Sequence, residues 1–171
     1  MKSFLTLALL HAFTIAYSQV DPEEIRRQAI ETGEAVKSQD YETLISHTHP
    51  KVLEIIGGRE KMISILKKGD AELKQQGISY DKVIIGAPSE TVAAGDELHC
   101  LVPQTVVMKK SGEKYKIKSE TALIGVTKDN GKHWYFIDAV NLNMDNVKTV
   151  LPNYNPTLKL PAKKRPERVN N

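Results

Sequence analysis

The chain has 171 residues, 40% hydrophobic and 26% charged, a balance typical of a folded globular domain and unlike that of a disordered chain. Its 24 basic and 21 acidic residues give a formal net charge of +3, which argues against a dedicated nucleic-acid-binding protein. Cys100 is the single cysteine, so no internal disulfide can form. Its apolar neighbours predict a buried, unreactive thiol.

The first 18 residues predict an export signal. Lys2 precedes an apolar run that begins at Phe4, and the small residues Ala16 and Ser18 occupy the positions that a signal peptidase recognises. The run is shorter than the roughly 20 apolar residues of a permanent membrane span. We therefore expect cleavage after Ser18 and a mature chain without a membrane anchor, soluble in the periplasm or outside the cell.

Helical signals fill the next part of the chain. Asp21 followed by Pro22 is typical of a helix start, and apolar residues then recur at helical spacing. Asp40 begins a second, short helix, and Gly77 is a plausible stop for a third. Helices are expected from residue 22, from residue 41 and over 59–76, with a short apolar run at 52–56.

The following part has the pattern of strands. Apolar and polar residues alternate along 97–109 and 115–127, and Asp129-Asn130-Gly131 is a strong hairpin signal. Further strands are expected at 78–85 and 133–139. Helices followed by antiparallel strands predict one α+β domain over 19–140, with three helices covering one face of a four-stranded antiparallel sheet. The expected core comprises Leu44, Ile45, Leu66, Leu73, Leu98, Val102, Ile117, Leu123, Trp134 and Phe136.

Residues 141–171 are expected to form an extension with a basic, proline-containing tail. Pro156, Pro161 and Pro166 are expected to rule out regular structure, and 147–151 allows one helical turn at most. Residues 159–171 carry five basic residues against one acid, a net charge of +4. The tail is expected to be extended and to contribute little to the core; the alternative is a basic arm for an acidic partner.

Three short segments carry a family resemblance: Asp40–Ile45, Gly57–Ile63 and Lys132–Asp138. They are similar, in this order, to the short second helix, the entry of the third helix and the last strand of the NTF2-like superfamily, so the chain resembles that superfamily, especially its SnoaL-like branch. It implies three helices folded against a curved antiparallel sheet that forms a cone with a pocket. Members include isomerases, dehydratases and hydrolases as well as proteins without known reaction, so the fold does not settle the function.

Three residues are candidates for chemistry in a functional site. His47 and His49 are weak candidates for a metal site, because two imidazoles two residues apart can ligate one ion but no further cluster supports them; the alternative is a polar helix end. Asp138 is a candidate general base, since a carboxylate in an apolar cone has a raised pKa, or else it caps the turn after its strand. No metal and no cofactor are expected.

Three functions compete. The first is a non-catalytic protein whose cone binds a small, mostly apolar ligand near Tyr41, Trp134 and Asp138. The second is an isomerase- or dehydratase-like enzyme with Asp138 or His49 as general base and Tyr41 as hydrogen-bond donor. The third is an interaction module that forms a homodimer through the outer face of the sheet. No complete catalytic motif of the family aligns with the chain, which favours the first.

Overall fold

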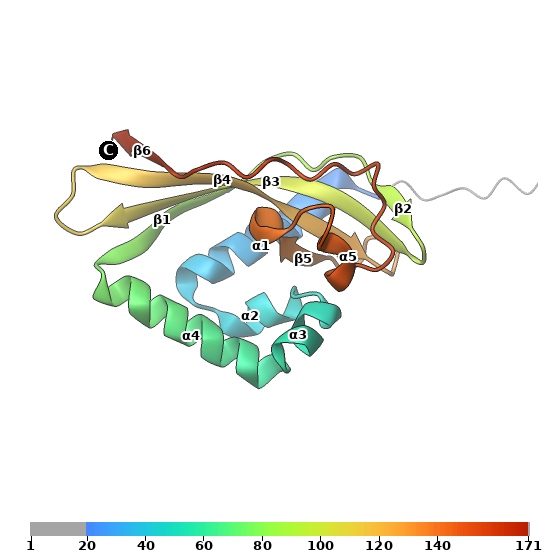
Figure 1. Ribbon diagram of the computed structural model, residues 1–171, viewed down its shortest axis with the longest axis horizontal. Coiled ribbons are helices and arrows are strands. Elements are labelled where there is room, and N and C mark those ends of the chain that lie inside the picture. The colour runs from blue at the N-terminus through green and yellow to red at the C-terminus, as the bar shows by residue number, and fades with distance from the viewer. Residues whose placement is uncertain (1–19, 171) are drawn as a thin grey trace, which may run out of the picture.

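The computed structural model describes residues 20–170; the expected cleavage site after Ser18 and the final Asn171 lie outside this range. Helices come first and strands second, with the C-terminal chain returning along the sheet (Figure 1). The elements are α1 (Pro22–Ser38), α2 (Tyr41–Ser46), α3 (Pro50–Ile56), α4 (Arg59–Gln75), β1 (Ile78–Ile85), β2 (Val92–Ala94), β3 (Glu97–Lys110), β4 (Tyr115–Thr127), β5 (Tyr135–Asp138), the short helices η1 (Ala139–Asn141) and α5 (Val147–Val150), and β6 (Glu167–Asn170).

The helices begin where the sequence places capping groups. The carboxylate of Asp21 accepts a hydrogen bond from the Glu23 N–H at the start of α1, and that of Asp40 accepts one from the Thr43 N–H at the start of α2. Gly57 ends α3 with a φ of 98°, a left-handed conformation that glycine adopts without steric cost. The predicted helix starts are thus confirmed.

The sheet is antiparallel, with strand order β1-β3-β4-β5. The long strands β3 and β4 pair without a register shift from Leu98↔Thr127 to Lys109↔Lys116. Two further strands raise the number from the predicted four to six: β2 pairs with β3, and β6 pairs with β4. The prediction of a tail without regular structure was wrong for 167–170, because the strand begins after Pro166 and no proline lies inside it.

Apolar side chains cover both faces of the sheet where β4 ends, since Ala122–Thr127 are all buried. One cluster packs α1 against the sheet; the other packs the chain after β5 against the opposite face. The first contains Ile25, Ala29, Ile85, Cys100, Val102, Leu123, Trp134 and Phe136. The second contains Ile124, Val126, Ile137, Ala139, Val147, Leu151, Tyr154 and Leu158. The packed body therefore continues beyond residue 140 to Leu158.

Gly33 of α1 lies where this helix meets β1. A Cβ atom at this position would lie 2.9 Å from Cγ1 of Val83, so the glycine allows the close approach of helix and strand. Cys100 is buried as predicted, and burial raises the pKa of its thiol to about 12. Within residues 20–170, no helix has both the length and the apolar character of a membrane span.

Half of the residues that the sequence places in the core are buried. Ile45, Val102, Leu123, Trp134 and Phe136 are buried as predicted. The prediction of burial was wrong for five residues that are only half-buried: Leu44, Leu66, Leu73, Leu98 and Ile117. Two of these belong to α4, which packs against α2, α3 and β1 and has no fully buried side chain. Figure 1 shows α4 at the border of the molecule, so helical periodicity alone overestimated its burial.

The fold class predicted from sequence is confirmed. Helices precede a curled antiparallel sheet and α1 packs against one of its faces, an arrangement consistent with an NTF2-like cone. Trp134, which the sequence places at the mouth of that cone, is completely buried and therefore does not line an open pocket there.

Candidate functional site

The segment between α2 and α3 joins the helices to the edge of β5. Thr48 forms a parallel bridge with Phe136, and the Phe136 N–H donates to the His47 carbonyl over 2.7 Å. His47 and His49 are both buried, with 6% of their surface exposed. The two histidines singled out in the sequence therefore lie at a tightly bonded junction, where water has little access.

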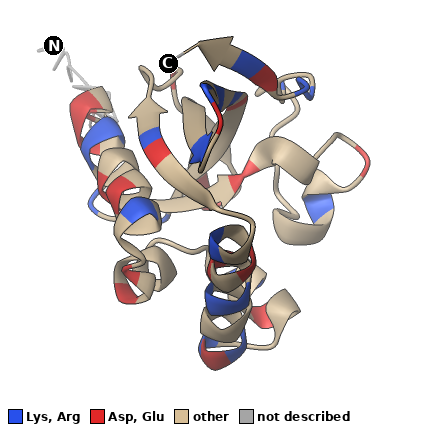
Figure 2. Cartoon of the chain, turned by 90° about the vertical axis from the view of Figure 1, so that its left-hand side faces the viewer, with Lys and Arg blue, Asp and Glu red and all other residues tan. Residues whose placement is uncertain are grey.

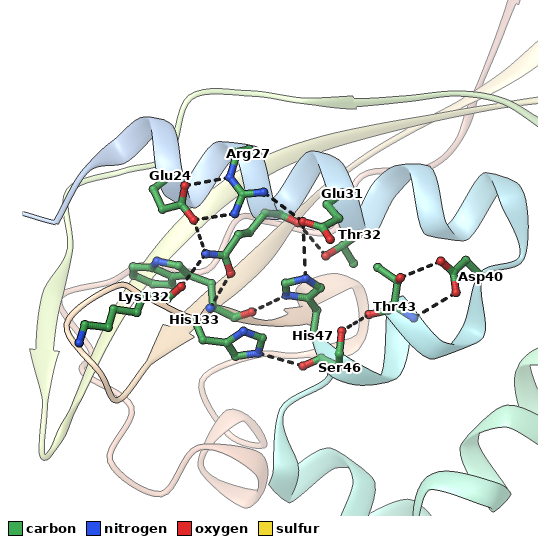
Figure 3. A network of polar contacts seen from close by, with 12 residues as sticks. Glu24, Arg27, Glu31, Thr32, Asp40, Thr43, Ser46, His47, Lys132 and His133 are labelled. Atoms are coloured by element: carbon green, nitrogen blue, oxygen red, sulfur yellow. Dashed lines mark hydrogen bonds and ion pairs between the residues drawn. The ribbon is translucent and has the colours of Figure 1, made fainter.

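His47 belongs to a polar network beneath α1 (Figure 3). Its Nδ1 lies 2.8 Å from the Trp134 carbonyl, so Nδ1 carries a proton and donates. Its Nε2 lies 4.0 Å from Oε2 of Glu31, which also accepts from Arg27. The His133 ring stacks on His47 with 5.0 Å between centroids, and Nε2 of His133 donates to the Ser46 carbonyl over 3.0 Å. Both imidazoles thus hold α2 to the start of β5.

Gln28 of α1 completes this network. Its carbonyl oxygen accepts from the Trp134 N–H over 2.8 Å, and its amide donates to the Lys132 carbonyl over 3.0 Å and to Glu24 over 2.6 Å. The Trp134 indole N–H donates to the Gly131 carbonyl. Trp134 is therefore a core residue with all its polar groups bonded, and it presents no surface to a ligand.

His49 belongs to a second buried cluster, centred on Glu97. The His99 Nε2–H donates to Oε2 of Glu97 over 2.9 Å, and Nε2 of His49 lies 3.5 Å from Oε1. The ammonium of Lys128 lies 3.2 Å from the same Oε1. Nδ1 of His49 accepts the Lys51 N–H at the start of α3, so the proton of His49 resides on Nε2, facing the carboxylate.

The pKa values of this cluster follow from burial and pairing. Burial acts to raise the pKa of Glu97, but hydrogen bonds from His99 and Lys128 outweigh it, and the net pKa is below the usual value. Burial lowers the pKa of His49, and the nearby Glu97 opposes this effect. The favoured state is thus an ionised Glu97 between neutral His49 and the His99 N–H. His49 has no free lone pair with which to take a proton from a substrate.

The other candidate residues lie apart from these clusters. Asp138 is exposed; its Oδ1 accepts the Val140 N–H over 2.8 Å and the Thr121 hydroxyl over 3.2 Å. It therefore caps η1, the alternative considered for it above. The Tyr41 hydroxyl donates to Asp70 of α4 over 2.7 Å, which raises the pKa of Tyr41 to about 12. No hydrogen bond or ion pair within residues 20–170 joins Asp138, His49 and Tyr41.

The described residues also contain no group of three His, Cys, Asp or Glu side chains placed to hold a metal ion. Nε2 of His49 points to Glu97, whereas Nδ1 of His47 points to the Trp134 carbonyl. The two imidazoles are separated because each is bound to a different part of the sheet. Their His-x-His spacing reflects two structural roles at one junction.

A groove lies elsewhere, between the chain that follows β5 and the C-terminal arm, which we define as residues 159–170. Its volume is about 420 Å³, within the range of roughly 300–1,000 Å³ typical of small-molecule sites. Val140 and Met144 in its wall are 40% and 47% exposed, unusually high for large apolar side chains. The lining residues are Val140, Asn141, Leu142, Asn143, Met144, Leu160, Pro161, Ala162 and Lys163.

The sequence analysis missed this groove. Apolar residues alternate with asparagines along 140–144, a signal that was available, but the segment was assigned to an extension outside the domain. The opposite wall, 160–163, is about 20 residues further along the chain. It comes close only because Val147–Leu158 packs on the sheet and turns the arm back.

Comparisons with known proteins give little further information. No family model matches the chain, and no curated protein matches it. Among solved structures, an LEH-like epoxide hydrolase of M. tuberculosis is similar over 77% of this chain and 92% of its own, with a TM-score of 0.38 and 16% sequence identity. A likeness this weak says nothing about a reaction or about site residues. Assignment to the SnoaL-like branch remains a prediction.

Proposed function

We propose that this protein is an exported, non-catalytic binding protein whose ligand occupies the groove between residues 140–144 and 160–163. The observation that carries the proposal is the groove itself, a volume of about 420 Å³ walled largely by apolar side chains. Binding sites typically combine an apolar lining with a few polar groups that orient the ligand. Asn141, Asn143 and Lys163 are such groups here.

The lining favours a small, mostly apolar ligand that carries an acidic group. Val140, Leu142 and Met144 offer apolar contact, and the unbranched methionine side chain adapts to different shapes. The ammonium of Lys163 lies 3.3 Å from Oδ1 of Asn141, at the wall of the groove. A carboxylate or sulfonate on the ligand would pair with this ammonium.

The proposal moves the ligand away from the residues that the sequence favoured. Trp134 has no exposed surface, Asp138 caps η1, and the Tyr41 hydroxyl is bound to Asp70. The enzyme alternative loses its support for a related reason, since Asp138 and Tyr41 are engaged elsewhere, Nδ1 of His49 accepts the Lys51 N–H and Nε2 of His49 carries the proton. A binding role requires none of these groups.

The test uses 8-anilinonaphthalene-1-sulfonate, a fluorescent probe with an apolar body and one acidic group. Val140→Phe and Ala162→Phe fill the groove, and each should weaken binding by about tenfold or more, about 1.4 kcal/mol. Ile65→Phe adds the same ring at an exposed position of α4 and should leave binding unchanged. Lys163→Ala should weaken binding, whereas Lys159→Ala, outside the groove, should not.

Trp134 emission provides the control for folding, because this residue is the single tryptophan and is fully buried. Two results would contradict the proposal: a wild-type protein that does not bind the probe, or an equal loss of probe binding in Ile65→Phe and Val140→Phe. Native mass spectrometry of protein from its own compartment then identifies the natural ligand.

Export is part of the same proposal and rests on the leader at residues 1–18. N-terminal sequencing of the mature protein should begin at Gln19, and a chain that begins at Met1 would refute it.

A homodimer through the outer sheet face is a second candidate. Ile84 of the edge strand β1 is 52% exposed, which favours contact with another apolar surface. Sedimentation velocity of the wild type and of Ile84→Lys tests this: a dimer that the substitution dissociates supports the second candidate, and a monomeric wild type removes it.

A further inference from the structure

The pairing of β6 with β4 brings the basic tail beside a second basic segment. The tail alone carries a modest net charge of +4 over 159–171. In the fold, Glu167–Asn170 pairs antiparallel with Tyr115–Lys118, at the end of the sheet where β3 turns into β4 (Figure 1). Two segments about 50 residues apart in sequence therefore share one surface, which we call the basic end.

The basic end has a large excess of positive charge. It comprises Lys109, Lys110, Lys114, Lys116, Lys118, Lys163, Lys164, Arg165 and Arg168. Within 109–118 and 163–170 these nine residues face two acids, Glu113 and Glu167, a net charge of +7. The other residues of 20–170 carry 14 basic and 19 acidic side chains, a net charge of −5. The near-neutral total conceals a strong separation of charge.

Part of this charge is compensated and part is free. Glu120 pairs with Lys118 and Lys164, and Asp81 pairs with Lys116 over 3.0 Å. Lys109, Lys110, Lys114 and Arg165 make no ion pair within residues 20–170, and all four are exposed. These four side chains are available to a partner.

Like charges also face each other directly across the sheet. Lys109 lies opposite Lys116 in the β3–β4 register, an arrangement that destabilises a sheet unless another group compensates the charge. The hydrogen bond from Lys116, with further charge from Lys109 and Lys82, lowers the pKa of Asp81. A positive field at this end therefore persists despite the nearby acid.

We propose that the basic end binds an acidic polysaccharide, a linear polymer with repeated carboxylate or sulfate groups. A lipid surface is disfavoured because none of the exposed large apolar side chains within 20–170 belongs to 109–118 or 163–170. Nucleic acid is disfavoured because the Arg168 guanidinium lies over the Tyr115 ring, 4.6 Å from its centroid, and covers this face against base stacking. Exposed lysines act as point charges that suit repeated acidic groups.

Figure 2 views this end of the molecule and shows basic residues on the strands near the C-terminus. The basic end shares Lys163 with the proposed ligand groove, but its hairpin part is separate from the groove, because no lining residue of the groove lies within 109–118. Substitutions in the hairpin between β3 and β4 therefore test this inference without touching the groove.

The test measures binding to heparin and to polygalacturonate at increasing salt. Lys110→Glu with Lys114→Glu changes the hairpin, Arg165→Glu with Arg168→Glu changes the tail, and Lys61→Glu with Lys68→Glu on α4 is the control with the same change in net charge. The hairpin and tail variants should each weaken binding by about tenfold or more and reduce its salt dependence. The α4 variant should change it by less than about twofold.

Three results would overturn the inference. Equal losses in the hairpin and α4 variants would mean that net charge alone is responsible. A loss of binding confined to the tail variant would mean that residues 163–170 bind as a free arm and not as one surface together with the hairpin. Tighter binding to duplex DNA, or to vesicles of phosphatidylglycerol, than to either polysaccharide would assign the surface to another class of partner.

Discussion

Ending the chain after Asn146 should prevent folding, although the sequence places 141–171 outside the domain. The truncation removes four side chains with between 0% and 5% of their surface exposed: Val147, Leu151, Tyr154 and Leu158. At about 1.5–3 kcal/mol for each fully buried apolar side chain, the loss is about 6–12 kcal/mol. Net folding free energies are about 5–15 kcal/mol, so this loss removes most or all of the stability. It also uncovers Ile124, Val126 and Ile137 on β4 and β5.

A chain that ends after Leu158 is the matched control. It lacks only the C-terminal arm, whose side chains are exposed except for Leu160 and Val169, and a strand of four residues at the sheet edge. We expect it to fold and to lose about 1 kcal/mol. Urea denaturation, followed by Trp134 emission and by far-ultraviolet circular dichroism, measures the stability of both truncated chains. A chain ending after Asn146 that unfolds cooperatively near the wild-type midpoint would refute the assignment of 147–158 to the core.

The remaining predictions concern single groups. Gln28→Leu leaves the buried Trp134 N–H without an acceptor and should cost about 2 kcal/mol, whereas Gln75→Leu, exposed on α4, should be nearly neutral; equal midpoints in denaturant would contradict this. Gly125→Ala places a Cβ 2.8 Å from the Cys100 sulfur and should lower stability by about 1–3 kcal/mol, measured by thermal unfolding. Because the folded-state pKa values of His49 and Glu97 are both lowered, the unfolded chain binds more protons in acid; stability should fall as pH drops below about 6.5 and again below about 4.5. Glu97→Gln should reduce the second decline without abolishing it, because the pKa values of Glu24, Asp81 and Glu120 are also lowered; a decline of unchanged size would exclude a contribution from Glu97. The Cys100 thiol should react with a disulfide reagent only after unfolding, so rapid labelling of native protein would contradict its burial.

The sequence correctly predicted the features that depend on residues close to one another in the chain. Asp21, Asp40 and Gly57 delimit helices because their own side chain or backbone conformation satisfies the helix ends. The alternation along 115–127 predicted β4 with its observed bounds. The end of β4, Ala122–Thr127, is buried on both faces because the second core after β5 covers the far face.

For the candidate site, in contrast, the local sequence did not indicate what the residues do in the fold. His47 and His49 are conspicuous because they are close in sequence, but Nδ1 of His47 donates to the Trp134 carbonyl and Nδ1 of His49 accepts the Lys51 N–H. Nε2 of His49 lies 3.5 Å from Glu97. Sequence spacing contains no information about these partners, two of which are more than 40 residues away. Asp138 likewise has the position of a catalytic carboxylate in sequence and the geometry of a helix cap in the fold.

The sequence by itself determined the α+β class, the order and most bounds of the elements and the burial of Cys100, because periodicity, capping residues and turn residues act within a few positions of the chain. Only the tertiary structure decided what the C-terminal segment does. Its packing onto the far face of the sheet, the groove that its return creates and its pairing with β4 depend on contacts between residues 20–60 positions apart. Such contacts are selected by the sum of buried area across the whole fold, which no local pattern records.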